Sequence, residues 1–327
     1  MHPHIKALMA TFNKSTLKDF QAFLRPFNEA EVTKWIICSD YCIEDKSKFY
    51  DSMTFTLIPY VLSFEELQEF INEIAPTDLK KTQSIDERFT TFIKSGLTFS
   101  FSFIFQKGKR NFFLKADMNQ YIEDMNRLKD QYQKWIINTP QNKVYYESVI
   151  KKLNKLEQEM RRDSFNKKLF HNIIIVQMLV AFIMATLKKE TDHTIEIISW
   201  LSDRDKIVDS YESLAYDIAH SSFHELCTRM GLNTQNTTER FLIASTDKNT
   251  NQLWFDEMLR VPDLITGATA GRNYLPKKKD KYDLIFEKVF SENKYLSIID
   301  CTRKNNVGRL NVLKKQQKSN TQVKEQS

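Results

Sequence analysis

Residues 173–187 (IIIVQMLVAFIMATL) form an apolar segment with one strongly polar interruption, Gln177. The segment is shorter than the roughly 20 residues that a helix needs to cross a bilayer. Lys188 and Lys189 follow it directly. We therefore expect a helix buried on most of its sides inside a large domain rather than a membrane span. A chain of 327 residues, 41% of them hydrophobic, is large enough to bury such a helix.

The cysteines and the first residues indicate a cytoplasmic protein. Four cysteines in a chain of this length are too few for a disulfide scaffold, and none of them forms a CxxC pair. The first 15 residues lack the apolar core and the cleavage site of a signal peptide. The net charge of +6 permits a polyanionic partner without requiring one.

Strand and helix patterns alternate along the chain. Runs rich in β-branched and aromatic residues predict strands at 34–43, 53–61, 97–105, 194–201 and 240–245. Helical spacing predicts helices at 64–74, 117–160 (divided by Pro140), 172–187, 208–230 and 254–270. Ser63 and Glu66 form a capping box for the helix at 64–74. This order predicts an α/β fold with a mixed sheet flanked by helices.

The same pattern divides the chain into regions. Residues 1–31 form a helical lead-in, and residues 32–110 and 190–275 form the core. Residues 111–189 form a helical insertion with a core helix, which we expect to project as a hairpin and to offer a surface for a protein partner. Residues 276–327 form a basic tail with few apolar residues, which we expect to be disordered.

The sequence lacks several common catalytic motifs. It has only six glycines and contains neither GxGxxG nor GxxxxGK[ST], so it has no glycine-rich cradle for a dinucleotide or a nucleoside triphosphate. It also contains neither HExxH nor GxSxG. These absences exclude the zinc-peptidase and serine-hydrolase classes that carry these motifs.

Three aspartates occupy positions that suggest a shared site. Asp40 lies within the apolar first strand, Asp203 follows the fourth strand, and Asp263 lies in the helix after the fifth strand. Carboxylates at the ends of strands project into the crevice where α/β proteins bind ligands. If they converge, they would hold Mg²⁺ or Mn²⁺, which prefer oxygen ligands. Asp205 is an alternative to Asp203, which we favour because it is closer to the strand end.

This arrangement resembles the ribonuclease H-like superfamily, and in particular a bacterial family of uncharacterised proteins with a late "ADLxAG"-type motif. The corresponding pieces are Ser39-Asp40, the lysine-bearing segment 79–81 (LKK) and the segment 262–268 (PDLITGA). The resemblance covers about residues 32–110 and 190–272. It implies a metal-dependent nuclease site at Asp40, Asp203 and Asp263, with Lys80 or Lys81 near the phosphate of a nucleic acid.

The chain departs from this pattern at one acidic position. The family carries an acidic residue directly after the first aspartate, where this sequence has Tyr41; Glu44, Asp45 or Glu69 could replace it. Simpler roles are also open for the aspartates. Asp203 or Asp205 could cap the next helix, Asp263 could interact with a helix dipole, and Asp40 could pair with a base.

A second group of metal-binding residue types lies on one predicted helix. Asp217, His220, His224 and Cys227 share one stripe, and the two histidines have the i, i+4 spacing that allows both to bind one zinc ion. Packing of the histidine pair, or an acid/base role for one histidine at the acidic site, is the alternative.

Basic residues could follow a phosphate backbone. They occur at three places in the sequence: Lys107, Lys109 and Arg110; Arg161, Arg162, Lys167 and Lys168; and residues 277–279 (KKK). Two functions therefore compete. One is a Mg²⁺- or Mn²⁺-dependent nuclease acting on RNA or DNA. The other is a catalytically inactive ribonuclease H-like protein that binds a partner through residues 111–189.

Overall fold

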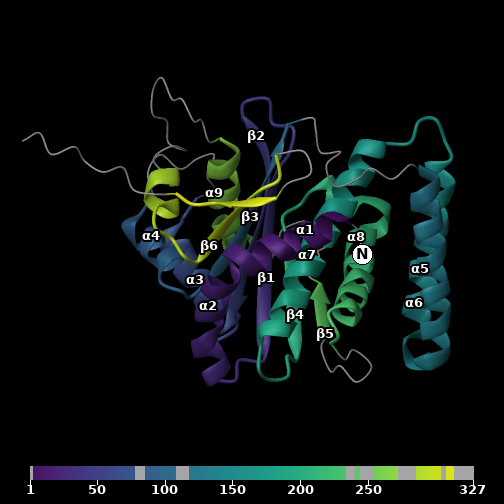
Figure 1. The fold of residues 1–327 in the computed structure, drawn as a ribbon, viewed down its shortest axis with the longest axis horizontal. Helices are drawn as coiled ribbons and strands as arrows, with labels where there is room; N and C mark the ends of the chain where they lie inside the picture. Colours follow the sequence, from purple (N-terminus) through teal and green to yellow (C-terminus); the bar gives the residue numbers. More distant parts are fainter. Residues whose placement is uncertain are drawn as a thin grey trace, which may run out of the picture.

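The structure is a computed structural model that describes residues 3–77, 85–107, 118–232, 240–243, 253–271, 285–302 and 307–312. It confirms the predicted α/β class, with a mixed sheet flanked by helices (Figure 1). Within the described residues the sheet has seven strands in the order β5-β4-β1-β2-β3-β6-β7. The strands are β1 (Lys34–Cys42), β2 (Tyr50–Pro59), β3 (Phe99–Gln106), β4 (Ile197–Ser202), β5 (Arg240–Ile243), β6 (Leu296–Asp300) and β7 (Gly308–Leu310).

The strand directions place β1 at the centre of the sheet. Strands β1, β2 and β3 form an antiparallel meander. Strand β4 pairs with β1 in parallel, and β5 pairs with β4 in parallel, as expected for strands joined by helical crossovers. The carboxyl ends of β1 and β4 therefore meet at one edge of the sheet.

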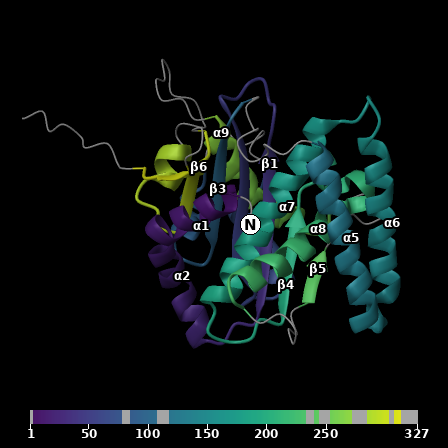
Figure 2. The ribbon, with the colours of Figure 1, turned by 45° about the vertical axis from the view of Figure 1, so that its right-hand side comes forward.

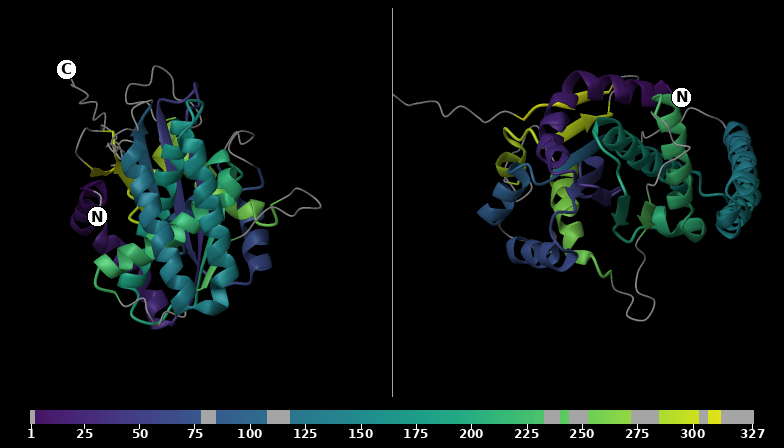
Figure 3. Two further views of the ribbon diagram at one scale, coloured as in Figure 1. Left: turned by 90° about the vertical axis from the view of Figure 1, so that its right-hand side faces the viewer. Right: turned by 90° about the horizontal axis from the view of Figure 1, so that it is seen from below.

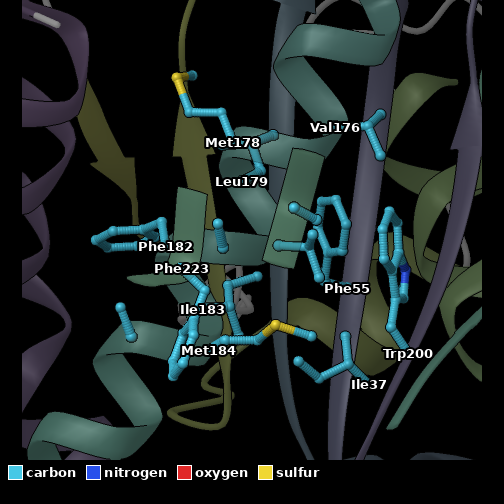
Figure 4. Packing of buried hydrophobic residues seen from close by; sticks show 14 of the residues in the cluster. Ile37, Phe55, Val176, Met178, Leu179, Phe182, Ile183, Met184, Trp200 and Phe223 are labelled. Carbon is cyan, nitrogen blue, oxygen red and sulfur yellow. The ribbon is translucent and has the colours of Figure 1, made fainter. Parts of the chain in front are cut away.

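Helices α1 (Pro3–Ser15), α2 (Leu17–Glu29), α7 (Lys167–Glu190) and α8 (Lys206–Arg229) pack on one face of the sheet. Figure 4 shows side chains of α7, among them Val176 and Ile183, beside Phe55 and Trp200 of the strands. Helix α7 is buried as predicted, but it is longer than residues 172–187. It is the one helix in the described part of the chain that is long and apolar enough to cross a membrane, and 83% of its most apolar window is buried.

The helical lead-in predicted over residues 1–31 consists of α1 and α2, which are part of the core. Helices α1 and α2 are amphipathic, and their apolar sides belong to the same core as the strands. The ring of Phe12 packs edge-to-face on Phe182 of α7, with centroids 5.8 Å apart, and Phe20 packs on Phe99 of β3 at 5.1 Å. The large aromatic side chains of β3 require a cover on this face, which the two helices provide.

The opposite face carries helices α3 (Phe64–Ile74), α4 (Glu87–Lys94) and α9 (Asp256–Ala270) and the short π-helical turn η3 (Phe286–Phe290). The predicted capping box is present. The Glu66 N–H donates to Ser63 Oγ at 3.2 Å, and the Ser63 N–H donates to the Glu66 carboxylate at 2.8 Å. Helix α9 lies across β1 and β2, and it is the helix that brings Asp263 to the sheet.

The helical insertion consists of α5 (Met118–Asn138), the 3₁₀ turn η2 (Pro140–Asn142) and α6 (Lys143–Met160). Pro140 divides the two helices, as predicted. The hairpin does not project freely, because it lies along the outer side of α8 (Figures 2 and 3). Lys152 Nζ donates to the buried Asp217 carboxylate of α8 at 2.8 Å, and Val149 and Leu153 are buried in the core.

The prediction of a disordered tail over 276–327 was wrong for residues 285–302 and 307–312. Leu296, Ile298 and Ile299 are buried, and β6 pairs in parallel with β3. This strand covers the edge of β3, whose backbone groups would otherwise lack partners in the sheet. Residues 313–327, which include the end of the expected tail, lie outside the described residues.

Gly96, at the turn before β3, gives a test of this packing. Its φ is +87°, and a Cβ placed there would lie 2.8 Å from the ring of Tyr295. We expect Gly96→Ala to lower the free energy of unfolding by about 2–4 kcal/mol, because the conformational strain and the clash add. Gly231→Ala is the matched control, since Gly231 has φ +75° but an open environment. A urea titration showing equal losses would contradict this packing.

Candidate active site

Asp40 lies near the end of the central strand, on the face covered by α9. Side chains alternate along a strand, so Asp40 shares this face with Ile36 and Cys38, which are both buried. Its own side chain is only 8% exposed. In the register of β1 and β2 it opposes Thr54. The first strand therefore buries a carboxyl group at the edge of the sheet where β1 and β4 end.

Asp203 is held beside β1 by the parallel pairing of β4. Ser39 pairs with Ser202 in this register, and the Asp203 N–H extends the ladder by donating to the Ser39 carbonyl at 3.1 Å. Asp203 Oδ1 accepts the Arg204 N–H at 2.7 Å. The backbone thus places Asp203 beside Ser39, the residue that precedes Asp40 in β1.

Asp263 reaches the same place from α9. One turn further along the helix, Thr266 Oγ donates to the Pro262 carbonyl at 2.7 Å and also lies 3.4 Å from the Asp40 carbonyl. The small residues that follow, from Gly267 to Ala270, are all buried and allow α9 to approach the strands closely. From the sheet that α9 covers, Ser102 of β3 donates to Thr269 Oγ at 3.1 Å. The structure therefore places Asp40, Asp203 and Asp263 on three elements that meet at one edge of the sheet.

The charges of Asp203 and Asp263 both act on Asp40. Burial raises the pKa of Asp40 well above its usual range, and the charges of Asp263 and Asp203 raise it further. Hydrogen bonds from Thr266 and from the Tyr41 backbone offset only part of this increase. A negative charge on Asp40 is therefore unfavourable unless a proton or a cation neutralises it.

The donor set fits a hard divalent cation in chemistry and charge. Three carboxylates are the oxygen ligands that Mg²⁺ and Mn²⁺ prefer, and such an ion would relieve the repulsion at Asp40. In the part of the chain that the structure describes, however, no three His, Cys, Asp or Glu side chains are close enough to form a coordination group. The carboxylates share one electrostatic environment, and an ion would have to draw them closer together.

The other acidic candidates have local roles. Asp205 is the N-cap of α8, where its carboxylate accepts the Ile207 N–H at 2.7 Å, so the geometry favours Asp203 for the site. Glu44 pairs with Lys168 of α7, and Asp45 accepts hydrogen bonds from Ser47. Glu69 is exposed on α3.

Tyr41 occupies the position of the expected second acidic residue, and its side chain lies on the opposite face of the sheet from Asp40. Its hydroxyl is 2.7 Å from Ser39 Oγ of β1 and accepts a hydrogen bond from Ser202 Oγ of β4 at 3.0 Å. Trp200 Nε1 donates to the same Ser39 hydroxyl at 2.9 Å. Tyr41 therefore ties together the two strand ends that carry Asp40 and Asp203, a role that the sequence alone did not predict.

The histidine pair lies away from the acidic site, because α8 and α9 cover opposite faces of the sheet. Burial, with a smaller effect of His224, lowers the pKa of His220 to about 3. The Asp217 carboxylate binds Tyr145 Oη at 2.9 Å and Lys152 Nζ at 2.8 Å, so it serves the contact between α8 and α6. The acid/base role considered for one histidine at the acidic site is not what the structure shows.

Several cations lie at the edge of the sheet where Asp40 is found. Lys48, in the loop between β1 and β2, donates to the Gly267 carbonyl at 3.4 Å. Its positive charge lowers the pKa of the Cys42 thiol, whereas the negative charge of Asp40 raises it. Lys107 Nζ donates to the Lys48 carbonyl at 2.9 Å. Lys48 is not among the basic residues predicted from the sequence, although the loop that carries it begins at the end of the strand that contains Asp40. Lys80, Lys81, Lys109, Arg110 and residues 277–279 lie outside the described residues.

Comparison with known proteins gives no match to a family model, to a curated protein or to a solved structure. The function therefore has to be inferred from the site itself.

The raised pKa of Asp40 predicts how stability depends on pH when divalent ions are removed with EDTA. Because the folded-state pKa exceeds the unfolded value of about 3.9, the stabilising contribution is complete below that value. It is lost as the pH rises through the folded-state pKa. Asp40→Asn should therefore raise the urea midpoint relative to wild type near pH 7, with the difference disappearing near pH 3.

Asp45→Asn is the control of opposite sign. Hydrogen bonds from the Ser47 side chain and backbone lower the pKa of Asp45, so this carboxylate stabilises the fold near neutral pH and the substitution should lower the urea midpoint. A lower midpoint for Asp40→Asn in EDTA near pH 7 would contradict the electrostatic description of the site.

Tyr41→Phe tests the connection between β1 and β4. The substitution leaves the hydroxyls of Ser39 and Ser202 without the phenol, and Ser39 and Ser202 are buried. We expect the free energy of unfolding to fall by about 1–3 kcal/mol. Tyr60→Phe, at a position 39% exposed, should change it by less than about 0.5 kcal/mol. Equal effects of the two substitutions in denaturant titrations would refute the role of the Tyr41 hydroxyl.

Proposed function

We propose that this protein is a cytoplasmic, divalent-metal-dependent nuclease of ribonuclease H-like type, which hydrolyses phosphodiester bonds in RNA or DNA. The observation that carries the proposal is the meeting of Asp40, Asp203 and Asp263 at the end of the central strand. A carboxylate on a central first strand, one after the fourth strand and one on a late helix is the arrangement that the resemblance implies. The antiparallel meander β1-β2-β3, with β4 and β5 parallel to β1, supports the same fold.

Asp40, Asp203 and Asp263 would hold Mg²⁺ or Mn²⁺. A bound ion of this kind activates water and stabilises the leaving oxygen of a phosphodiester. The remaining residues fix and shield the carboxylates. Thr266 and the Tyr41 backbone bind Asp40, α9 covers it, and Tyr41 holds the β4 end that carries Asp203. The high pKa of Asp40 supports this role, because a carboxyl group in this position favours a cation.

The nucleic acid would approach the same edge of the sheet. Lys48 and Lys107 lie there on the loop and strand next to Asp40, and Lys168 at the start of α7 contacts Glu44 of the same loop. Cations in these positions would attract a phosphate backbone and make binding dependent on salt. Lys80 and Lys81 remain proposed phosphate contacts from the resemblance. The four cysteines, none of which forms a disulfide, support a cytoplasmic location.

The exposed end of the helical insertion favours a second candidate function. Ile137 at the end of α5 and Val144 at the start of α6 are 78% and 82% exposed, although both are apolar. Together with carboxylates that do not form a coordination group, this observation suits a catalytically inactive ribonuclease H-like protein that binds a protein partner through its insertion.

Cleavage assays distinguish the two functions. With Mg²⁺ or Mn²⁺, we expect the wild-type protein to cleave labelled RNA or DNA, single- or double-stranded. Asp40→Asn and Asp263→Asn should each lose about a hundredfold or more of this activity, since even substitutions of outer residues around a metal can cost up to a hundredfold. Asp45→Asn, outside the carboxylate group, should retain it.

Absence of cleavage by the wild-type protein, together with no Mn²⁺ binding in calorimetry, would contradict the nuclease proposal. If Ile137→Glu and Val144→Glu then abolish the capture of a partner without unfolding the chain, the second candidate function holds.

A further inference from the structure

His220 and His224 form a close pair on α8 that the proposed nuclease function does not use. Their Nε2 atoms are 3.2 Å apart, and their rings meet edge-to-face with centroids 4.6 Å apart. The i, i+4 spacing places both side chains on one side of the helix. Both residues are half-buried, so the pair is neither sealed in the core nor spread over an open surface.

The distance between the two nitrogens suits a shared metal ion. Zinc binds imidazole nitrogen at about 2.0–2.1 Å in tetrahedral geometry, which separates two such ligands by roughly 3.3 Å. The observed 3.2 Å agrees with this separation. In the structure the two Nε2 atoms are hydrogen-bonded to each other, so one of them carries a proton. A shared ion would replace this hydrogen bond when both imidazoles carry their protons on Nδ1, because both Nε2 lone pairs are then available.

The neighbouring hairpin holds the two rings in place. The indole of Trp135 on α5 lies against both of them, with centroids 6.1 Å from His220 and 5.7 Å from His224. Trp135 is itself packed against Tyr132 at 5.0 Å and Tyr146 at 5.8 Å. Two rings that are already oriented lose little further conformational freedom when they bind an ion.

The contact between α8 and the hairpin is rigid for a second reason. One turn before His220, the Asp217 carboxylate binds Lys152 and Tyr145 of α6, and Tyr132 Oη donates to the Asp217 carbonyl at 3.1 Å. These bonds are buried or half-buried, and they join α8 to both helices of the insertion. The histidine pair therefore lies where hydrogen bonds hold α8 against both helices of the insertion.

We propose that His220 and His224 bind one transition-metal ion of the zinc class (Zn²⁺, with Ni²⁺ and Co²⁺ as analogues) through their Nε2 atoms. In the described residues no third His, Cys, Asp or Glu completes a coordination group, so water or a ligand supplied from outside takes the remaining positions. Imidazole suits Zn²⁺ and Ni²⁺, whereas carboxylates suit Mg²⁺ and Mn²⁺. The proposal is independent of the nuclease function, since α8 and the acidic cluster lie on opposite faces of the sheet.

The test uses the full chain, freed of metal with EDTA and then desalted, in an Asp40→Asn/Asp203→Asn background that disables the acidic cluster. Calorimetric titration with Zn²⁺ should show one ion bound per chain. His224→Ala and His220→Asn should each weaken binding at least tenfold. His193→Ala, which removes a half-buried histidine that contacts the Val32 carbonyl, should leave it unchanged. Circular dichroism establishes that each variant is folded.

Tryptophan fluorescence locates the ion. Ni²⁺ quenches nearby indoles, so it should reduce the emission of Trp135, and the reduction should be lost in Trp135→Phe and in His224→Ala. Zinc affinity that is unchanged in both histidine variants would overturn the proposal. Quenching that persists in Trp135→Phe would overturn it as well, because the bound ion would then lie elsewhere. No zinc binding at all would mean that the two imidazoles form only a hydrogen bond to each other.

Discussion

A carboxyl group buried at the end of the central strand is the constraint on which the architecture of the site depends. Asp40 is covered by α9, and Asp203 and Asp263 are its neighbours. An ionised carboxylate in such a place costs free energy unless a cation or a proton compensates it. A fold has no reason of stability to gather three like charges at one strand end. The proposed function accounts for this arrangement, because a bound cation would compensate these charges.

The two faces of the sheet differ in a way that serves this arrangement. Strand β3 alternates Phe with Ser, so that its rings pack against α1, α2 and α7 while its hydroxyls lie beneath α9. On the α9 face, Thr54 and Ser102 are bonded at 2.9 Å, and Ser102 in turn binds Thr269 of α9. Small polar strand residues and small helix residues allow a close approach of backbone to backbone. That closeness is what brings Thr266 to the end of β1 and Asp263 near Asp40.

The parts of the fold that the sequence predicted are those with strong local signals. The capping box of Ser63 and Glu66, the division at Pro140 and the five main strands all follow from periodicity and caps. The nearness of Asp40 and Asp203 could be predicted because both lie at or near strand ends, whose places in the sheet follow from strand order. Asp263 lies in the middle of α9, so its place depends on how that helix packs on the sheet. The distance between the carboxylates could not be predicted, because it depends on side-chain conformations such as that of Asp203, which binds the Arg204 N–H.

Other features depend on contacts that no local pattern records. Strand β6 is only five residues long and pairs with β3, almost 200 residues earlier in the chain. The role of Tyr41 depends on its contacts with two hydroxyl groups, one of them on β4. The sequence shows only that a tyrosine replaces the expected acidic residue, and it does not show these contacts. Three successive residues near the start of α8, Tyr211, Glu212 and Ser213, adopt left-handed backbone angles, although none of them is glycine. Tertiary contacts determine the pairing of β6 and the role of Tyr41.

The most direct measurement of the central claim is the titration of Asp40 itself, followed through the ¹³C shift of its carboxyl carbon and assigned with Asp40→Asn. In EDTA we expect a pKa well above that of an ordinary aspartate. Saturating Mg²⁺ should lower this pKa, because the ion binds only the ionised form. An ordinary pKa in EDTA that Mg²⁺ leaves unchanged would contradict this claim. Burial and the neighbouring charges would then not raise the pKa of Asp40, and Asp40 would not be a ligand for a cation.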